Sequence, residues 1–118
     1  MKRATGDFGE DLAAHYLQQA GLTVLDRNFR CQAGEIDLIA QDQTELVFVE
    51  VRTRSGSAFG TPEDSVTARK RRKMAECALS YLAEHQARGR PWRVDLVAVE
   101  LDNGRVVRVA HYKHVLQD

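Results

Sequence analysis

Long apolar runs are absent from this 118-residue sequence, and so are closely spaced cysteines. No run approaches the ~20 apolar residues that a membrane helix needs, so the sequence predicts no transmembrane segment. The N-terminus also lacks the apolar core of an export signal. Cys31 and Cys77 stand in no CxxC pair, which disfavours a disulfide scaffold or a zinc finger. We therefore expect a cytoplasmic protein without membrane association.

Several common enzyme motifs are missing as well. The sequence contains no glycine-rich phosphate loop of the nucleotide-binding types and no GxSxG nucleophile elbow. His111 and His114 are close in sequence, but no cysteine or acidic cluster accompanies them, so we expect no zinc site. Nucleophilic hydrolase chemistry by serine or cysteine therefore has no support.

Charge of one sign is not in excess, because 17 basic side chains balance 17 acidic ones. The distribution is uneven, with four basic and nine acidic residues in 1–50 against ten basic and four acidic residues in 51–93. A near-neutral total argues against a general nucleic-acid coat protein. A basic middle beside an acidic first half fits a positive surface next to a carboxylate site, although a solvated helix face gives the same pattern.

Hydrophobic periodicity predicts one α/β domain over residues 1–118, with a mixed sheet of about five strands in the order αβββαββ. We expect helices at 4–20 and 62–88, and strands at 22–30, 35–41, 45–53, 92–101 and 105–112. The glycine- and serine-rich stretch 54–62 is predicted to be a loop, and Asn103-Gly104 a hairpin turn. The buried stripe of the second helix is assigned to Val66, Ala75, Ala78, Leu79 and Leu82.

The second and third predicted strands carry acids among apolar residues. If their hairpin closes with an even-numbered loop, residue 41 pairs with 46, 39 with 48, 37 with 50 and 35 with 52. Asp37 and Glu50 then become cross-strand neighbours with Cβ atoms ~5 Å apart. Glu35 would face Arg52. An odd-numbered loop would shift the register and separate the acids.

Two carboxylates placed opposite each other cost stability and raise each other's affinity for a proton. A divalent cation between them is one reason to keep both, and Mg²⁺ favours one or two carboxylates with waters and substrate phosphates. That combination suits phosphodiester hydrolysis. An ordinary ion network, in which Asp37 pairs with Arg52 or Arg30, explains the spacing about equally well.

The spacing from Asp37 to Glu50-Val51-Arg52 resembles the PD-(D/E)xK nuclease signature, with arginine at the usual lysine position. The helix string Gly9-Glu10-Asp11-Leu12-Ala13 resembles the GExxA helix of Holliday-junction resolvases. GEIDLIA followed by LVFVEVRTR, with the basic helix and RVDLVAV, resembles the bacterial YraN family nearly end to end. That family is largely uncharacterised and is grouped with endonuclease-like proteins.

The resemblance implies a restriction-endonuclease-like fold and a metal-dependent DNA endonuclease, acting on branched or junction DNA. It implies that Asp37, Glu50 and the carbonyl of Val51 hold Mg²⁺ or Mn²⁺, and that Glu10 assists. Arg52 stands at the catalytic lysine position. Because arginine keeps its proton, it cannot be a general base, but it can orient water or stabilise phosphate charge. By analogy with resolvases, the assembly implied is a homodimer.

A run of five cations follows the candidate site in sequence and points nearly all round the second helix. Such clusters contact phosphate backbones without reading sequence, although a merely solvated helix would look the same. The residues assigned to nucleic-acid binding are Arg54, Arg69, Lys70, Arg72 and Lys73. Asp95, in the apolar fourth strand, is assigned a structural role.

Two further hypotheses stay open beside the nuclease. The protein could be a nucleic-acid-binding module of the same fold that has lost turnover, and the arginine at position 52 is the main support for this alternative. It could also be an adaptor whose basic helix docks on an acidic protein.

Overall fold

The computed structural model describes residues 4–55 and 66–116, with side chains from Phe8 onward. The chain order is αβββαββ, as the sequence predicts. The elements are α1 (Ala4–Gln19), β1 (Thr23–Cys31), β2 (Gly34–Asp42), β3 (Glu45–Ser55), α2 (Ala68–Glu84), β4 (Trp92–Asp102) and β5 (Arg105–Tyr112). Within these described segments, neither helix combines the length and the apolar character needed to cross a bilayer.

The five strands form one mixed sheet in sequence order, β1-β2-β3-β4-β5. Every neighbouring pair is antiparallel except β3 and β4, which run parallel. Parallel neighbours need a crossover connection, and the segment containing α2 provides it. The β4–β5 turn has positive φ at both Asn103 and Gly104, the conformation that an Asn-Gly hairpin turn requires.

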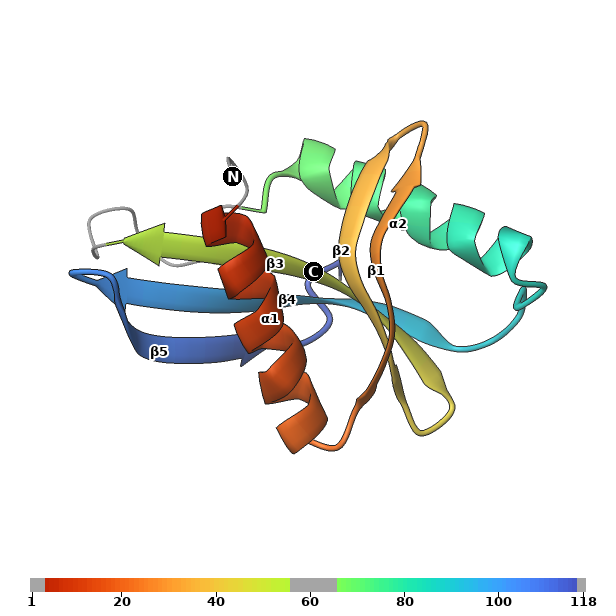
Figure 1. The fold of residues 1–118 in the computed structure, drawn as a ribbon. Helices are drawn as coiled ribbons and strands as arrows, with labels where there is room; N and C mark the ends of the chain where they lie inside the picture. Colours follow the sequence, from red (N-terminus) through yellow and green to blue (C-terminus); the bar gives the residue numbers. More distant parts are fainter. Residues whose placement is uncertain (1–3, 56–65, 117–118) are drawn as a thin grey trace.

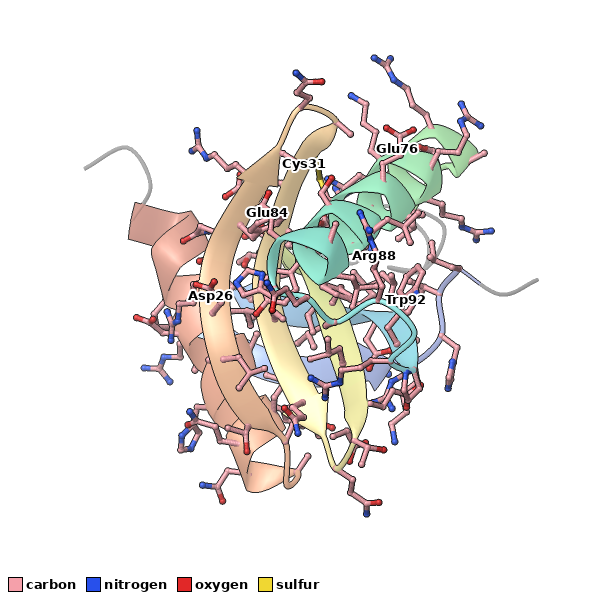
Figure 2. The ribbon with its side chains drawn as sticks, turned by 90° about the vertical axis from the view of Figure 1, so that its right-hand side faces the viewer. Asp26, Cys31, Glu76, Glu84, Arg88 and Trp92 are labelled. Atoms are coloured by element: carbon pink, nitrogen blue, oxygen red, sulfur yellow. A yellow bond between two sulfur atoms is a disulfide. The ribbon has the colours of Figure 1, made fainter. Side chains whose placement is uncertain are left out.

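The helices cover opposite faces of the sheet (Figures 1 and 2). Buried residues of α1 pack with alternate residues of β2, β3 and β4 in one core cluster. Buried residues of α2 pack on the other face around Phe48 and Leu96. Because side chains alternate across a strand, inner strands covered on both faces are apolar at successive positions, as 46–49 are.

The β2–β3 hairpin has the even register that the sequence predicts, with Gln41 opposite Leu46 and Ile39 opposite Phe48. The paired stretch ends at Leu38 and Val49. Beyond that point β2 continues with β1 toward α2, while β3 continues beside β4, so the sheet forks (Figure 1). The next residues on the two branches are Asp37 and Glu50.

The second helix differs from its prediction at both ends. It begins at Ala68, where the Thr67 side chain accepts a hydrogen bond from the Lys70 N–H, and it ends at Glu84. The buried stripe also differs, because Leu79 is 55% exposed. Its buried residues are Met74, Cys77, Ala78, Tyr81 and Leu82. Val66, Ala78 and Leu82 of the predicted stripe are buried, although Val66 lies before the helix begins. The prediction is wrong for Leu79, which is exposed, and for Ala75, which is only partly buried.

The structure also differs from the sequence prediction at the start of the predicted loop and at the two cysteines. Arg54 and Ser55 belong to β3, and the rest of the predicted loop lies outside the described residues. The expectation against a disulfide is wrong, because Cys31 at the end of β1 is bonded to Cys77 of α2, with Cα atoms 5.7 Å apart. Figure 2 shows this bond beside Cys31, between hairpin and helix. The cysteines are 46 residues apart, so only the packing of α2 on the sheet reveals the pairing.

Candidate active site

Asp37 lies where the sheet forks. Its Oδ2 accepts a hydrogen bond from the Val51 N–H at 2.8 Å. A side chain thus replaces the backbone partner that β2 would otherwise offer to β3. Val51 is paired with Val97 of β4 on its other side, so the N–H donor belongs to a firmly paired strand. This hydrogen bond ties the two branches of the fork together and fixes the orientation of the carboxyl group.

Asp37 has an unusual affinity for its proton. Burial first, and then the charge of Glu50, raise the pKa of Asp37 from 3.8 to about 7, against the opposing effect of the Val51 hydrogen bond. A smaller contribution to this raised pKa comes from Glu35, and the charge of Lys70 lowers it. The two acids predicted from the hairpin register are therefore close enough to influence each other electrostatically.

Glu50 is the more buried partner, with a side chain only 8% exposed. Its two carboxylate oxygens face two different cations. Arg52 Nε lies 3.0 Å from Oε2, although its N–H does not point at that oxygen, and Lys70 Nζ lies 3.5 Å from Oε1. A buried carboxylate requires such compensation. The site thus combines two acids with a cation from the same strand and another from α2.

Lys70 reaches the site because of its position on α2. It stands four residues before Met74 and seven before Cys77, both fully buried, so it extends the buried stripe by one turn toward the N-terminus. Because the five cations point nearly all round the helix, at least one of them has to approach the sheet. The buried residues of α2 identify this cation as Lys70, but only once the structure shows which face of the helix is buried.

The helix glutamate of the predicted site lies beside the fork. Glu10 is buried, and its two oxygens accept hydrogen bonds from Asn28 Nδ2 at 3.3 and 3.2 Å. The same Asn28 nitrogen also donates to Glu35 Oε2 at 3.1 Å. Asn28 has φ of 54°, a conformation that asparagine tolerates well. No motif in the sequence indicates that Asn28 would link these two glutamates.

Gly9 explains how α1 comes so near. A Cβ at this position would collide with Thr53 Oγ1 of β3. Only glycine therefore allows the helix to approach the strand at this point, one residue before Glu10. The Gly-Glu pair thus has a geometric basis: glycine permits the contact, and glutamate occupies the space beside it.

The structure corrects the expected partner of Glu35 and limits how many side chains could bind a metal ion. Glu35 pairs with Asn28 instead of facing Arg52, because the β2–β3 ladder ends before that pair would form. In the described residues, no three His, Cys, Asp or Glu side chains are grouped closely enough to hold a metal ion by themselves. Any ion bound by Asp37 and Glu50 would need water or substrate to complete its shell.

Three other basic residues of α2 lie on a different face of the helix. Arg69, Arg72, Lys73 and Glu76 follow one another at helical spacing, and they line an open groove of about 340 Å³ against the β1–β2 turn. The structure therefore divides the predicted basic cluster into two groups. Lys70 joins the acids, whereas Arg69, Arg72 and Lys73 form a separate positive wall. Arg54 is half-buried near the end of β3.

Asp95 has surroundings of a different kind. It is fully buried, and Arg93 Nε donates to both of its oxygens at 3.0 and 3.1 Å. The His114 N–H donates to it at 3.1 Å, and His111 Nε2 lies 2.7 Å from Oδ2. Burial works to raise the pKa of Asp95, but these hydrogen bonds outweigh it and hold the pKa below its ordinary value. Arg93 also reaches Glu45 of β3 at 2.9 Å.

Comparison with known proteins gives one consistent result. The family described as "Uncharacterised protein family UPF0102" matches residues 9–99. A "UPF0102 protein" of Beutenbergia cavernae is 46% identical over 114 residues, 97% of each chain. Another, of Moorella thermoacetica, is 48% identical over 109 residues, covering 92% of this chain and 89% of its own. A third, of Nocardia farcinica, is 44% identical over 97% of this chain and 90% of its own.

Proposed function

This chain belongs to the uncharacterised protein family UPF0102, and we propose that it is a metal-dependent endonuclease that hydrolyses phosphodiester bonds of DNA, including branched or junction DNA. One observation carries the proposal. Asp37 and Glu50 are brought together at the fork of the sheet, where the pKa of Asp37 rises to about 7. Two adjacent acids, one of them with a raised pKa, are costly for stability alone, and perturbed pKa values of this kind concentrate at functional sites.

The donor set suits a hard divalent cation. Asp37 and Glu50 offer carboxylate oxygens, and the Val51 carbonyl is a third oxygen ligand by resemblance to nucleases. Mg²⁺ accepts one or two carboxylates and fills its shell with water and substrate phosphate, so a site without a third acid is adequate for it, and for Mn²⁺. When bound, such an ion polarises the phosphate and lowers the pKa of a coordinated water.

The other residues of the chain position the reaction. The Val51 N–H holds the Asp37 carboxyl group in one orientation. Arg52 stays charged and so serves as an electrostatic partner for the phosphate instead of a base. Glu10 is linked to Glu35 through Asn28, and this link holds it beside the fork, where it would assist the reaction.

The substrate follows from the charge on α2. Arg69, Arg72 and Lys73 form a positive wall one helix face away from Lys70, and with Arg54 they would contact successive phosphates of a DNA backbone. Contacts of this type position a strand without reading its sequence. Bacterial DNA lies in the cytoplasm, so the proposal also places the protein there. Resolvase-like enzymes are commonly homodimers, and by analogy we propose a homodimer for this chain.

A second candidate function is a nucleic-acid-binding module without turnover. It is favoured by the state of Glu50, whose oxygens are both neutralised by cations of the chain itself. Such a site would bind phosphates through Lys70 and Arg52 and would need no metal. The adaptor hypothesis, in which the positive wall docks on an acidic protein, has no observation of its own in its favour.

Cleavage of a labelled panel of single-stranded, duplex, flapped and four-way-junction DNA tests the proposal. We would compare wild type with Glu50→Gln, which keeps the side-chain shape, and with Glu84→Gln, an exposed acid at the other end of α2 from Lys70. The nuclease is supported if Mg²⁺ or Mn²⁺ activates wild type and Glu84→Gln but not Glu50→Gln. Equal cutting by all three would indicate another site or a contaminant. Binding without cutting would favour the binding module.

A further inference from the structure

We propose that Lys70 is the exchangeable counter-ion of the carboxylate pair: its ammonium neutralises Glu50 while no metal is bound, and it gives up that carboxylate when a divalent cation arrives. The inference rests on the proposed metal site and adds a role that the phosphate-binding assignment of Lys70 does not contain. Displaced from Glu50, the ammonium is free to contact a phosphate of the DNA.

The first argument is the occupancy of Glu50. An ionised carboxylate only 8% exposed cannot lose its compensating charge without a large penalty, so it needs a cation next to it. Arg52 approaches one oxygen and Lys70 the other. A divalent cation that takes Glu50 as a ligand therefore competes with a cation already in place.

The second argument is that the two cations are held differently. Arg52 is two residues from Glu50 on the same paired strand, and its Nε lies 3.0 Å from the carboxylate. Lys70 Nζ is at 3.5 Å, at the end of a flexible four-carbon chain that comes from another element, α2, and the two side chains are similarly exposed, 31% for Lys70 and 35% for Arg52. The longer contact makes Lys70 the more easily displaced of the two, and rotation of its side chain leaves its backbone, capped by Thr67, in α2.

The third argument is that Lys70 acts on both acids. Besides its contact with Glu50, its charge lowers the pKa of Asp37. An ammonium that stabilises both carboxylates occupies the same electrostatic position as a metal bound between them. Like charges in one small site repel, so lysine and metal are alternatives.

Calorimetric titration of the full-length protein with MnCl₂ tests this idea. We would compare wild type, Lys70→Met, Lys73→Met and Asp37→Asn. Lys73→Met removes the same charge from the same helix, in the groove on its other face. We expect Lys70→Met to bind Mn²⁺ about tenfold more tightly than wild type, Lys73→Met to stay within about twofold, and Asp37→Asn to lose binding.

The outcomes separate the two proposals. If Asp37→Asn loses binding but Lys70→Met matches Lys73→Met or binds more weakly, the metal site stands and the counter-ion role is wrong. If no variant binds Mn²⁺, the metal site itself is wrong, and the counter-ion role with it.

Thermal unfolding gives a second measurement that does not need turnover. In EDTA, Lys70→Met should melt below wild type, because Glu50 has lost one of its two cations. Added MnCl₂ should then raise its melting temperature more than it raises that of wild type or Lys73→Met. An equal rise in all three proteins would overturn the inference.

Discussion

Two aspartates lie on inner strands of the same sheet, Asp37 on β2 and Asp95 on β4, and their surroundings differ. Asp95 is fully buried, yet Arg93, His111 and the His114 N–H all bind it, and its pKa falls below the ordinary value. Asp37 is less buried and receives one backbone hydrogen bond in the described structure. Burial and Glu50 then raise its pKa to about 7.

The difference shows how an acid in an apolar strand can be interpreted. Asp95 is a structural acid, since hydrogen bonds to each of its oxygens satisfy it and Arg93 extends the network to the β2–β3 turn at Glu45. The Asp37 carboxyl group accepts fewer hydrogen bonds and can still bind a cation or a proton. Because proteins rarely leave a buried acid with little compensation, the less compensated Asp37 marks the place where a ligand belongs.

The largest expected effect is on stability, and it separates the two acids directly. Asp95→Ala should cost roughly 3 to 5 kcal/mol, because it leaves the buried Arg93 and the His114 N–H without their main acceptor. Asp37→Asn should instead raise stability at pH 7, because the neutral amide removes a charge that burial and Glu50 disfavour, while its oxygen can still accept from the Val51 N–H. Urea unfolding of both variants measures this. Equal losses would refute the distinction.

The two acids should also respond to pH with opposite sign. The folded-state pKa of Asp37, about 7, lies above its ordinary value of 3.8, so the folded protein binds the proton more tightly. Relative to Asp37→Asn, wild type should gain stability as pH falls from 7 to 4, by at most about 1.4 kcal/mol per pH unit. Chemical unfolding at several pH values measures this difference.

For Asp95 the sign reverses. Its pKa is lowered in the folded state, so its stabilising contribution is complete above 3.8 and is lost as pH falls through the folded-state value. Relative to Asp95→Asn, wild type should therefore lose stability on acidification below about pH 4. If wild type instead became more stable relative to Asp95→Asn in this pH range, the assigned hydrogen-bond network would be wrong.

A smaller effect tests the packing that brings α1 to the fork. Gly9→Ala should cost about 1 to 3 kcal/mol, because its Cβ collides with Thr53 Oγ1. Thr53→Ala in the same chain should recover part of that loss, since it removes the obstructing hydroxyl group. Urea unfolding of the two single variants and the double variant measures the coupling. Additive losses would show that this contact is not the cause.

The smallest effect concerns DNA affinity. Arg72→Ala should weaken binding to duplex DNA several-fold and reduce the slope of log affinity against log salt by about 1, as loss of one phosphate contact predicts. Arg108→Ala, an exposed arginine on β5, is the matched control and should change neither quantity. Fluorescence anisotropy at several salt concentrations measures both. A salt-independent affinity would favour a partner other than nucleic acid.

Much of the site was predictable from one local rule. Alternation along β2 and β3, combined with an even hairpin loop, places Asp37 next to Glu50, and the observed pairs Gln41–Leu46 and Ile39–Phe48 confirm that register. The same rule failed beyond Leu38 and Val49, because it assumes that the ladder continues: Asp37 and Glu50 are close but are not a ladder pair, and Glu35 does not face Arg52. The strands separate after Leu38 and Val49, and no local sequence pattern predicts this separation.

By itself the sequence determined the order of elements, the hairpin register and the position of two acids on it, because these follow from short-range backbone geometry and the periodicity of apolar residues. The tertiary structure alone decided which cation joins those acids, that Asn28 links Glu10 to Glu35, and that Cys31 meets Cys77. These contacts join residues from separate elements. They depend on where each helix settles on the sheet, which the packing of the whole core determines.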